Sequence, residues 1–584
     1  MKINRLASGL TLCALTVCTA QAAKYEVVEL PLRDKGINSY ARAINDKGDV
    51  LASIADPFNP PIDVDLIDFE NEILINALSD ADGASVGNIN DDDLLILYSF
   101  ITSDATTTNT FFPQSNDSTN PFFQQIARVQ SYVLENTEVE EKIGFDVIEQ
   151  DLQGLTKSAD TLSTGINNFS ATVGFGEAPF YKINYRNENG LNLRYHVQDF
   201  LVRGFMDING VTIEVPPIED LMGGISVAND INDSFEVAGY GSVDVLEEFE
   251  DVVEVCDDKN ERGDIPKEYC IRQLRDQYQS NIRGRLANSV SNRYPVDQTF
   301  KRRAIIWEFT SSGELLNSRE LGTLLEPAPG DETFYDSRAN AINNNGIAVG
   351  VSNDYYQDSQ TVVVNKAAIF DGDDVIGFIS DEEYIESTAL DINDNDVVVG
   401  YANKIITSAS RNKFFVYDYR GDVLSFPDDF FESSSSVARG INNNGLVVGE
   451  GQVDTDLIGS RRSEAFLYDI NTEEFTNINE LLSCDSPYTI VQGVDINDND
   501  EITATAVVYR ERSAINGELA LDDRGNTIFE NMSVAVKLVP IPGGSIDDCH
   551  LTNETIERKG GSLYYLLGLV LFVFSGRVRQ KLKG

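Results

Sequence analysis

The sequence predicts an all-β fold, a β-propeller of seven or eight blades with small helical insertions, and three observations lead to this prediction. A strand–turn–strand motif recurs along the 584 residues. An apolar strand rich in aromatic residues recurs between the motifs. The N-terminal segment resembles a strand that the C-terminal end of the array lacks, so the two ends are expected to meet and close a ring.

The strand–turn–strand motif consists of Ile-Asn, a polar turn and a β-branched run that ends in a small residue, as in Gly440–Gly449. Asn, Asp and Gly tolerate the left-handed backbone of tight turns, so each motif predicts a hairpin. The turn asparagines of the eight motifs are Asn45, Asn90, Asn167, Asn232, Asn343, Asn393, Asn442 and Asn497. The last four motifs recur every 49 to 55 residues, which is the period of a propeller blade, and the longer gaps before them predict insertions.

A second element, typified by Ala465–Tyr468, follows the motifs of the later half and is expected to be a buried inner strand. Its counterparts begin at Ala304, Ala368, Phe414 and Ala535. A third element, Phe475–Leu482, precedes the next motif, and Tyr25–Leu32 resembles it. Because little chain follows the strand at Ala535, we expect Tyr25–Leu32 to complete the last blade. An open solenoid is the competing architecture, and it would leave an exposed sheet edge.

Two insertions are expected in the repeat body, which spans residues 24–550. The first covers about 103–164 and contains a possible helix at Gln124–Glu138. The second covers about 245–300 and contains a helix at Pro266–Tyr278, with proline near its first turn. Loops on a rigid scaffold often carry recognition, and mobile decoration is the other interpretation of both segments.

Four of the six cysteines lie in the repeat body, and an even number in an oxidising compartment predicts two disulfides. Proximity favours a bond between Cys256 and Cys270, which would staple the second insertion. The other bond would join Cys484 to Cys549 and hold the end of the chain on the seam of the ring.

Residues 1–23 have the order of a secretory signal peptide: Lys2 and Arg5, then a short apolar run, then small residues. Ala22 and Ala23 mark the expected cleavage position for signal peptidase. The apolar run is too short to cross a hydrocarbon core of roughly 30 Å. The repeat body is therefore expected to be exported.

The C-terminal end carries a second targeting pattern, in which a linker at residues 551–561 leads into a membrane tail at residues 562–584. Gly560, Gly561 and Ser562 precede the apolar run Leu563–Ser575 and a cationic end. This order resembles the bacterial Gly-Gly C-terminal sorting signal, which implies cleavage near the glycines by a rhomboid-type protease. A retained single-span anchor is the alternative. Both place the body at the cell envelope or surface, and cleavage could also release it.

The chain is strongly acidic, with 95 Asp and Glu against 45 Lys and Arg and a net charge of −50. Such a surface repels nucleic acid, so DNA and RNA are excluded as partners. Two motif turns place oxygen side chains at alternate positions, as calcium loops do. These weak calcium candidates are Asp391, Asn393, Asn395, Asp495, Asn497 and Asn499. Turns bonded through their asparagine side chains explain all eight motifs without metal, so no cofactor is expected.

The motif Gly440–Gly449 with the later Glu464–Phe466 resembles the HAF-type repeats of bacterial extracellular proteins. The histidine of the His-Ala-Phe signature is replaced by Glu464 here. Together with the Gly-Gly tail, the whole chain resembles uncharacterised bacterial envelope proteins. The resemblance implies an address and a repeat architecture, and it implies no activity.

The functional prediction is a binding or structural module of the cell envelope, with an unknown protein or polysaccharide as its ligand. The alternative is a hydrolase or lyase that acts on extracellular or envelope polymers. His196 is the single histidine well inside the body, and carboxylate pairs are uninformative among so many acidic residues. No catalytic residue is assigned.

Overall fold

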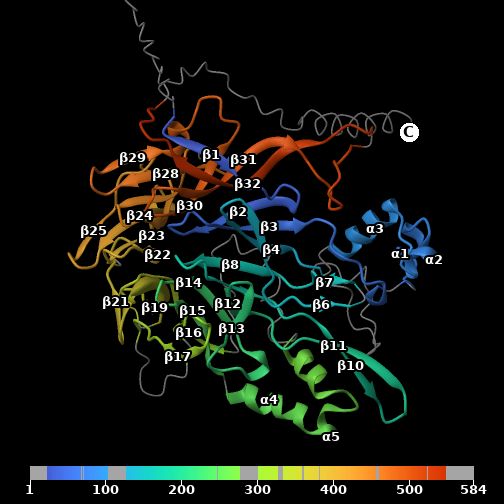
Figure 1. Ribbon diagram of the computed structural model, residues 1–584. Helices are drawn as coiled ribbons and strands as arrows, with labels where there is room; N and C mark the ends of the chain where they lie inside the picture. The colour runs from blue at the N-terminus through green and yellow to red at the C-terminus, as the bar shows by residue number, and fades with distance from the viewer. Residues whose placement is uncertain are drawn as a thin grey trace, which may run out of the picture. The chain divides into compact units, whose positions relative to one another are not determined.

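The computed structural model describes residues 23–546, apart from residues 68, 70, 103–125, 151, 246, 276–299, 326–332, 334, 358, 360, 381, 456–459 and 523. Seven four-stranded antiparallel sheets form the main body. The innermost strands of these sheets contact one another in cyclic order, so the sheets are the blades of a seven-bladed β-propeller (Figure 1). The blades surround a central channel. The predicted fold is confirmed, with seven blades.

The first three blades carry the longest connections. Blade 1 comprises β2 (Gly36–Ile44), β3 (Val50–Pro57), β4 (Val129–Glu135) and β5 (Glu138–Lys142). Blade 2 comprises β8 (Thr161–Ile166), β9 (Thr172–Gly176), β12 (Arg203–Ile208) and β13 (Val211–Val215). Blade 3 comprises β14 (Ser226–Ile231), β15 (Glu236–Val245), β16 (Phe300–Phe309) and β17 (Leu315–Glu320).

The later blades follow at shorter intervals. Blade 4 comprises β18 (Ser337–Ile342), β19 (Ala348–Tyr355), β20 (Val363–Asp371) and β21 (Asp374–Gly377). Blade 5 comprises β22 (Glu386–Ile392), β23 (Val397–Ile406), β24 (Ala409–Asp418) and β25 (Val423–Ser425). Blade 6 comprises β26 (Ser436–Ile441), β27 (Leu446–Gln452), β28 (Ser463–Asp469) and β29 (Glu474–Asn477). Blade 7 comprises β30 (Thr489–Ile496), β31 (Ile502–Glu511), β32 (Phe529–Pro540) and β1 (Tyr25–Glu29).

The N-terminal strand completes the last blade, as predicted. β1 pairs with β32 in antiparallel register from Tyr25 opposite Pro540 to Glu29 opposite Val536. Leu30 continues the contact, since its N–H donates to the carbonyl oxygen of Ala535 at 3.0 Å. The ring is therefore closed by strands from both ends of the chain, and blade 7 has no unpaired strand where an open array would have one.

Seven of the eight predicted motifs are hairpins between the first and second strands of a blade, and the motif at Asn90 is not. Asn90 instead caps helix α3 (Asp91–Thr102), with its side-chain oxygen accepting from the N–H of Asp93 at 2.9 Å. The prediction of a hairpin there was wrong. An Asn followed by acidic residues satisfies free N–H groups in a turn and at a helix start alike, so the local sequence does not separate the two.

The isoleucine of each of the seven hairpin motifs packs against the preceding blade. Ile342 lies in one buried cluster with Ala304 and Ile306 of blade 3, and Ile496 lies in another with Val448 and Ala465 of blade 6. The element typified by Ala465 forms the third strand of its blade, and it is buried as expected. Burying an isoleucine side chain contributes roughly 1.5–3 kcal/mol, so the motifs stabilise the junctions between blades.

The insertions follow the second strands of blades 1, 2, 3 and 7. The predicted first insertion, 103–164, was misplaced, because β4 and β5 of blade 1 lie inside it and Val129–Glu135 is a strand where a helix was expected. Insertion 1 spans residues 58–128 and carries α1 (Glu72–Ala77), α2 (Ala81–Ser85) and α3. The error arose because β4 has too little period-2 alternation to be separated from a short helix.

The other insertions are shorter. Insertion 2, residues 177–202, is a hairpin of β10 (Tyr181–Arg186) and β11 (Asn192–Val197). Insertion 3, residues 246–299, carries α4 (Glu247–Asp257), α5 (Lys259–Arg262) and a helix at 267–275. Insertion 4, residues 512–528, is held by two isolated bridges. The minor elements are β6 (Ile148–Glu149), β7 (Gly154–Leu155), η1 (Val64–Leu66), η2 (Leu221–Gly223) and η3 (Ile478–Leu481).

Cys256 and Cys270 form the predicted disulfide in insertion 3, with an S–S distance of 1.98 Å. Cys549 lies outside the described residues, so the bond from Cys484 stays a prediction. Ala23 is buried beside the seam, while Ala22 and the predicted processing residues Gly560, Gly561 and Ser562 also lie outside the described part. Within that part, no helix combines the length and the apolar character needed to span a membrane.

Candidate functional site

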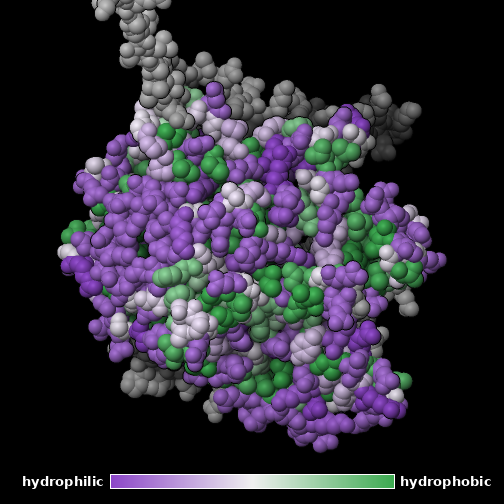
Figure 2. Space-filling model, in the orientation of Figure 1, coloured by the Kyte–Doolittle hydropathy of each residue, from purple (hydrophilic) through white to green (hydrophobic). Residues whose placement is uncertain are grey.

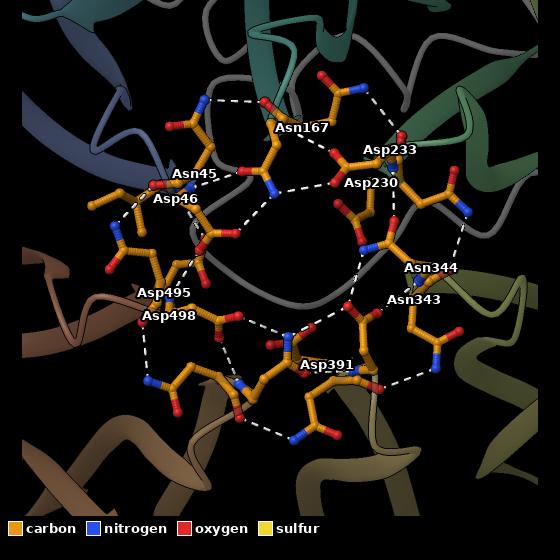
Figure 3. A pocket seen from close by; sticks show the side chains of 18 of the residues that line it. Asn45, Asp46, Asn167, Asp230, Asp233, Asn343, Asn344, Asp391, Asp495 and Asp498 are labelled. Carbon is orange, nitrogen blue, oxygen red and sulfur yellow. Dashed lines mark hydrogen bonds between the residues drawn. The ribbon is translucent and has the colours of Figure 1, made fainter.

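The seven motif turns meet at one end of the channel, which we call the motif end (Figure 3). A cavity of about 180 Å³ lies there, and its lining comes from the motif of every blade. The lining is mostly polar because each turn supplies Asn and Asp side chains. The repeated motifs therefore line one cavity together at the motif end.

The motif asparagine shapes its own turn. The Oδ1 atom of Asn442 accepts from the N–H of Asn444 at 3.1 Å and from the N–H of Leu446 at 2.9 Å. The same pair of hydrogen bonds, to the second and fourth residues onward, occurs in all seven hairpins. An Asn side chain thus replaces a backbone carbonyl in the turn, which leaves its amide nitrogen free to bond elsewhere.

The amide nitrogen of each motif asparagine bonds to the next blade. Asn442 donates to the carbonyl oxygen of Asn497 at 2.9 Å, and Asn497 donates across the closing seam to Asn45 at 2.9 Å. The chain of donors runs through Asn45, Asn167, Asn232, Asn343, Asn393, Asn442 and Asn497 and returns to its start. All seven blades are joined by one unbroken cycle of buried hydrogen bonds, which we call the asparagine ring.

The residue after each motif asparagine forms a second cycle at the mouth. The N–H of Asn344 donates to a carboxylate oxygen of Asp394 at 2.8 Å, and the N–H of Asp394 donates to the side-chain oxygen of Asn443 at 2.8 Å. The seven members of this outer ring are Asp46, Asn168, Asp233, Asn344, Asp394, Asn443 and Asp498. Asn and Asp alternate except at Asp498 and Asp46, because seven positions cannot alternate fully.

Three aspartates stand one residue before the motif isoleucine, in blades 3, 5 and 7. Asp495 accepts from the N–H of Ile496 at 2.8 Å and from the N–H of Ile44 in blade 1 at 2.9 Å. Asp230 and Asp391 make the equivalent bonds. In each of these blades one carboxylate therefore ties two neighbouring inner strands together. The sequence shows an Asp before Ile-Asn at these positions. The role of this Asp cannot be predicted from the motif alone, because the second N–H that it accepts belongs to another blade.

These aspartates have raised pKa values. Burial raises the pKa of Asp230 to about 6 and that of Asp495 to about 7. Burial and the charges of Asp495 and Asp230 raise the pKa of Asp391 as well. The carboxyls face the same channel and repel one another when ionised, and backbone N–H donors offset only part of that cost.

The weak calcium candidates occupy other roles. Asn393 and Asn497 belong to the asparagine ring, and Asp391 and Asp495 tie inner strands. The Asn395 amide donates to the carbonyl oxygen of Asn443 at 3.0 Å, and that of Asn499 donates to Asp46 at 2.7 Å. Within residues 23–546, as far as they are described, no three His, Cys, Asp or Glu side chains are grouped so as to hold a metal ion.

The insertions lie at the opposite end of the channel. In an antiparallel blade the connection from the second to the third strand leaves from the end opposite the motif hairpin. Insertions 4, 1, 2 and 3 come from the consecutive blades 7, 1, 2 and 3. Their described residues therefore form an arc along the rim of that end, which we call the insertion arc.

Neighbouring insertions contact one another. The N–H of Asn59 in insertion 1 donates to Ile515 of insertion 4 at 2.9 Å, and Asp63 pairs with Lys182 of insertion 2 at 3.6 Å. Arg272 of insertion 3 donates to the carbonyl oxygen of His196 in insertion 2 at 2.6 Å. The arc is thus a connected surface rather than four independent loops.

His196 lies inside this arc and not in the channel. It is buried in β11, and burial together with nearby cations lowers its pKa to about 4. The imidazole is therefore neutral near pH 7. Its neighbour Tyr195 packs on Tyr269 of insertion 3, with ring centroids 4.6 Å apart. The environment of His196 is that of a packed side chain between two insertions.

Fold and site define a seven-bladed β-propeller with one end of its channel encircled by hydrogen-bonded rings and insertions at the other end. The chain belongs to the family described as protein of unknown function DUF3466, whose model matches residues 4–577. A comparison with curated proteins gives no match.

Solved structures show remote likenesses. The puromycin-hydrolyzing peptidase of Mycobacterium tuberculosis is 8% identical, with 86% of this chain and 56% of that chain covered and a TM-score of 0.36. The β-propeller domain of the trilobed protease from Pyrococcus furiosus is 10% identical, with 64% and 93% covered and a TM-score of 0.25. A family 43 arabinoxylan arabinofuranohydrolase from Bacillus subtilis is 9% identical, with 89% and 95% covered and a TM-score of 0.23. At these scores the likenesses carry no argument about activity.

The raised pKa values predict a pH dependence of stability. Between about pH 4 and pH 7 the native Asp495 carboxyl holds a proton that the unfolded chain has lost, so the native state binds more protons. The free energy of unfolding should therefore fall as the pH rises through this window. Asp495→Asn removes the titration, and denaturant unfolding from pH 4 to pH 8 should show a flatter profile for this variant. Asp373→Asn, in an exposed turn, serves as the control, and equal profiles for all three proteins would contradict the assignment.

Proposed function

We propose that this protein is an exported, surface-directed β-propeller that acts as a binding module of the cell envelope through its insertion arc. The observation that carries the proposal is the contact between successive insertions from four consecutive blades. A surface that is ordered before binding loses less conformational entropy when a ligand docks. The ligand class is a protein or polysaccharide of the envelope.

The motif end supports the proposal because its polar side chains are already occupied by hydrogen bonds between blades. The amides and carboxylates of the two rings are committed to bonds between blades, so the rings serve as scaffold. The three channel aspartates are the feature that favours the alternative, a hydrolase, because carboxyls with raised pKa values can donate protons. Each of their oxygens already accepts a backbone N–H, as a side chain that joins strands does. Binding therefore fits the geometry better.

The insertion arc also exposes large apolar side chains. Ile73 and Val86 of insertion 1 are 46% and 71% exposed, and Leu521 of insertion 4 is 58% exposed. Figure 2 shows hydrophobic residues gathered over α1, α2 and α3 amid a largely hydrophilic surface. Exposed apolar clusters with polar surroundings mark interaction sites on soluble proteins. The arc is the proposed contact region because its exposed apolar side chains lie on insertions that contact one another.

Binding can be tested with matched substitutions. Val86→Asp places a charge in the arc, and Val423→Asp places one on β25, where Val423 is 59% exposed. The purified exported protein is sedimented with isolated envelope fractions, and the bound fraction is measured. Val86→Asp should reduce binding at least tenfold, since burying an unpaired charge in an interface is costly. Equal binding by both variants, or absence of binding by the wild type, would count against the proposal.

The proposed export and the cleavage of both ends can be tested by mass spectrometry of the protein from membrane and medium fractions. The proposal expects an N-terminus at Ala23 or Lys24 and a C-terminus near Gly560, because the pattern of both ends fits export followed by sorting. Gly560→Leu, which removes a helix-breaking residue, should retain the tail. An intact Gly584 in the wild-type protein would refute sorting by cleavage.

A further inference from the structure

The inner strand of every blade carries a β-bulge just before the motif. A bulge re-aims the side chain of its extra residue. The residues at this bulge are Arg42, Thr164, Asn229, Asn340, Leu390, Arg439 and Val494. Thr164, Asn229 and Asn340 donate to a carbonyl oxygen of the following blade at 2.8–2.9 Å, so they add to the contacts between inner strands. The two arginines, in blades 1 and 6, behave differently from each other.

Arg439 in blade 6 has a carboxylate partner. Its Nε and Nη2 atoms donate to the two carboxylate oxygens of Glu450 at 2.6 and 2.7 Å, a bidentate ion pair. Glu450 lies on β27 opposite Val437 in the strand register. With its amide oxygen turned toward Arg439, Gln492 of blade 7 also accepts from Nε at 2.9 Å. All of these contacts satisfy the guanidinium within the protein.

Arg42 in blade 1 stands at the same position of the repeat, and its partner position holds a serine. Ser53 lies on β3 opposite Tyr40, as Glu450 lies opposite Val437. The Ser53 hydroxyl accepts from Arg42 Nε at 2.8 Å. One hydroxyl oxygen thus replaces a carboxylate that would take two N–H groups, and the Arg42 Nη atoms make no hydrogen bond to the described residues.

The charge of Arg42 is also uncompensated. Among the described residues no carboxylate oxygen lies within 4.0 Å of its guanidinium. Burial lowers the pKa of Arg42 to about 10; Tyr40 acts in the opposite direction and the like charge of Arg439 in the same one, and the guanidinium stays protonated at neutral pH. A partly buried cation without a carboxylate partner is unusual, and more so in a chain with 95 acidic residues.

We propose that Arg42 binds the carboxylate of a small organic acid on the inner strand of blade 1, in the place that corresponds to the one Glu450 occupies beside Arg439. A guanidinium presents its N–H groups as a planar fork that matches a carboxylate in two parallel hydrogen bonds. Blade 6 shows that the local backbone accommodates this pair, because the bulge, the register and the arginine are the same in both blades. This inference does not depend on the insertion arc.

The test uses isothermal titration of the exported protein with D-glucuronate, acetate and chloride at constant ionic strength. Glucuronate and acetate should bind at one site per chain. Arg42→Gln should raise the dissociation constant at least tenfold. Ser53→Glu should have the same effect while keeping the arginine, because its carboxylate occupies the site as Glu450 does in blade 6. If one of the two variants fails to fold, the dissociation constant of the other variant tests the proposal.

A gain-of-site variant provides the matched control. Glu450→Ser combined with Gln492→Leu removes both partners of Arg439 and leaves it a serine, as Arg42 has in blade 1, so the stoichiometry should rise from one carboxylate to two. Oligogalacturonate distinguishes a polymer-borne uronate from a free acid, since tighter binding per carboxylate than for glucuronate identifies a polymer as the source. Equal affinity for chloride and the carboxylates, or wild-type affinity in both Arg42→Gln and Ser53→Glu, would overturn the proposal.

Discussion

The hydrogen bonds of one asparagine per blade hold this propeller together. Its oxygen closes the hairpin of its own blade, and its amide nitrogen reaches the backbone of the next blade. Because the cycle passes from Asn497 to Asn45, it also joins the two ends of the repeat array. Buried amide bonds of this kind are costly to leave unmade, so the ring constrains the spacing of neighbouring blades.

Most of the fold could be predicted because it rests on local patterns. The seven hairpins follow from turn residues and β-branched runs, and the closing strand follows from its likeness to Phe475–Leu482. The failures have the same origin. Asn90 satisfies a helix terminus with the chemistry that closes a turn, and β4 lacks the alternation that would separate a strand from a short helix.

The site was harder to predict, because its side chains act through hydrogen bonds between blades that are far apart in the sequence. The sequence identifies Asn442 as a turn residue, yet the acceptor of its amide is a carbonyl 55 residues away. The role of Asp495 likewise depends on the N–H of Ile44, at the other end of the chain. Arg42 is distinguished only by comparison with Arg439, once strand register places Ser53 and Glu450 at equivalent positions. These contacts between blades and these equivalent positions become visible only in the folded structure.

The most direct measurement compares the unfolding free energies of Asn442→Ala and Asn90→Ala. Asn442→Ala removes two turn bonds and two bonds between blades, to the Asn497 carbonyl oxygen and the Asp500 carboxylate. Each is worth about 1 kcal/mol net, so we expect a loss of about 4 kcal/mol. Asn90 has the same Ile-Asn context but is an exposed helix cap, whose amide also donates to Ser79 and Asp93. Because water replaces the bonds of an exposed side chain, its loss should be about 1 kcal/mol. Equal losses for the two variants would contradict the claim that the asparagine ring holds the blades together.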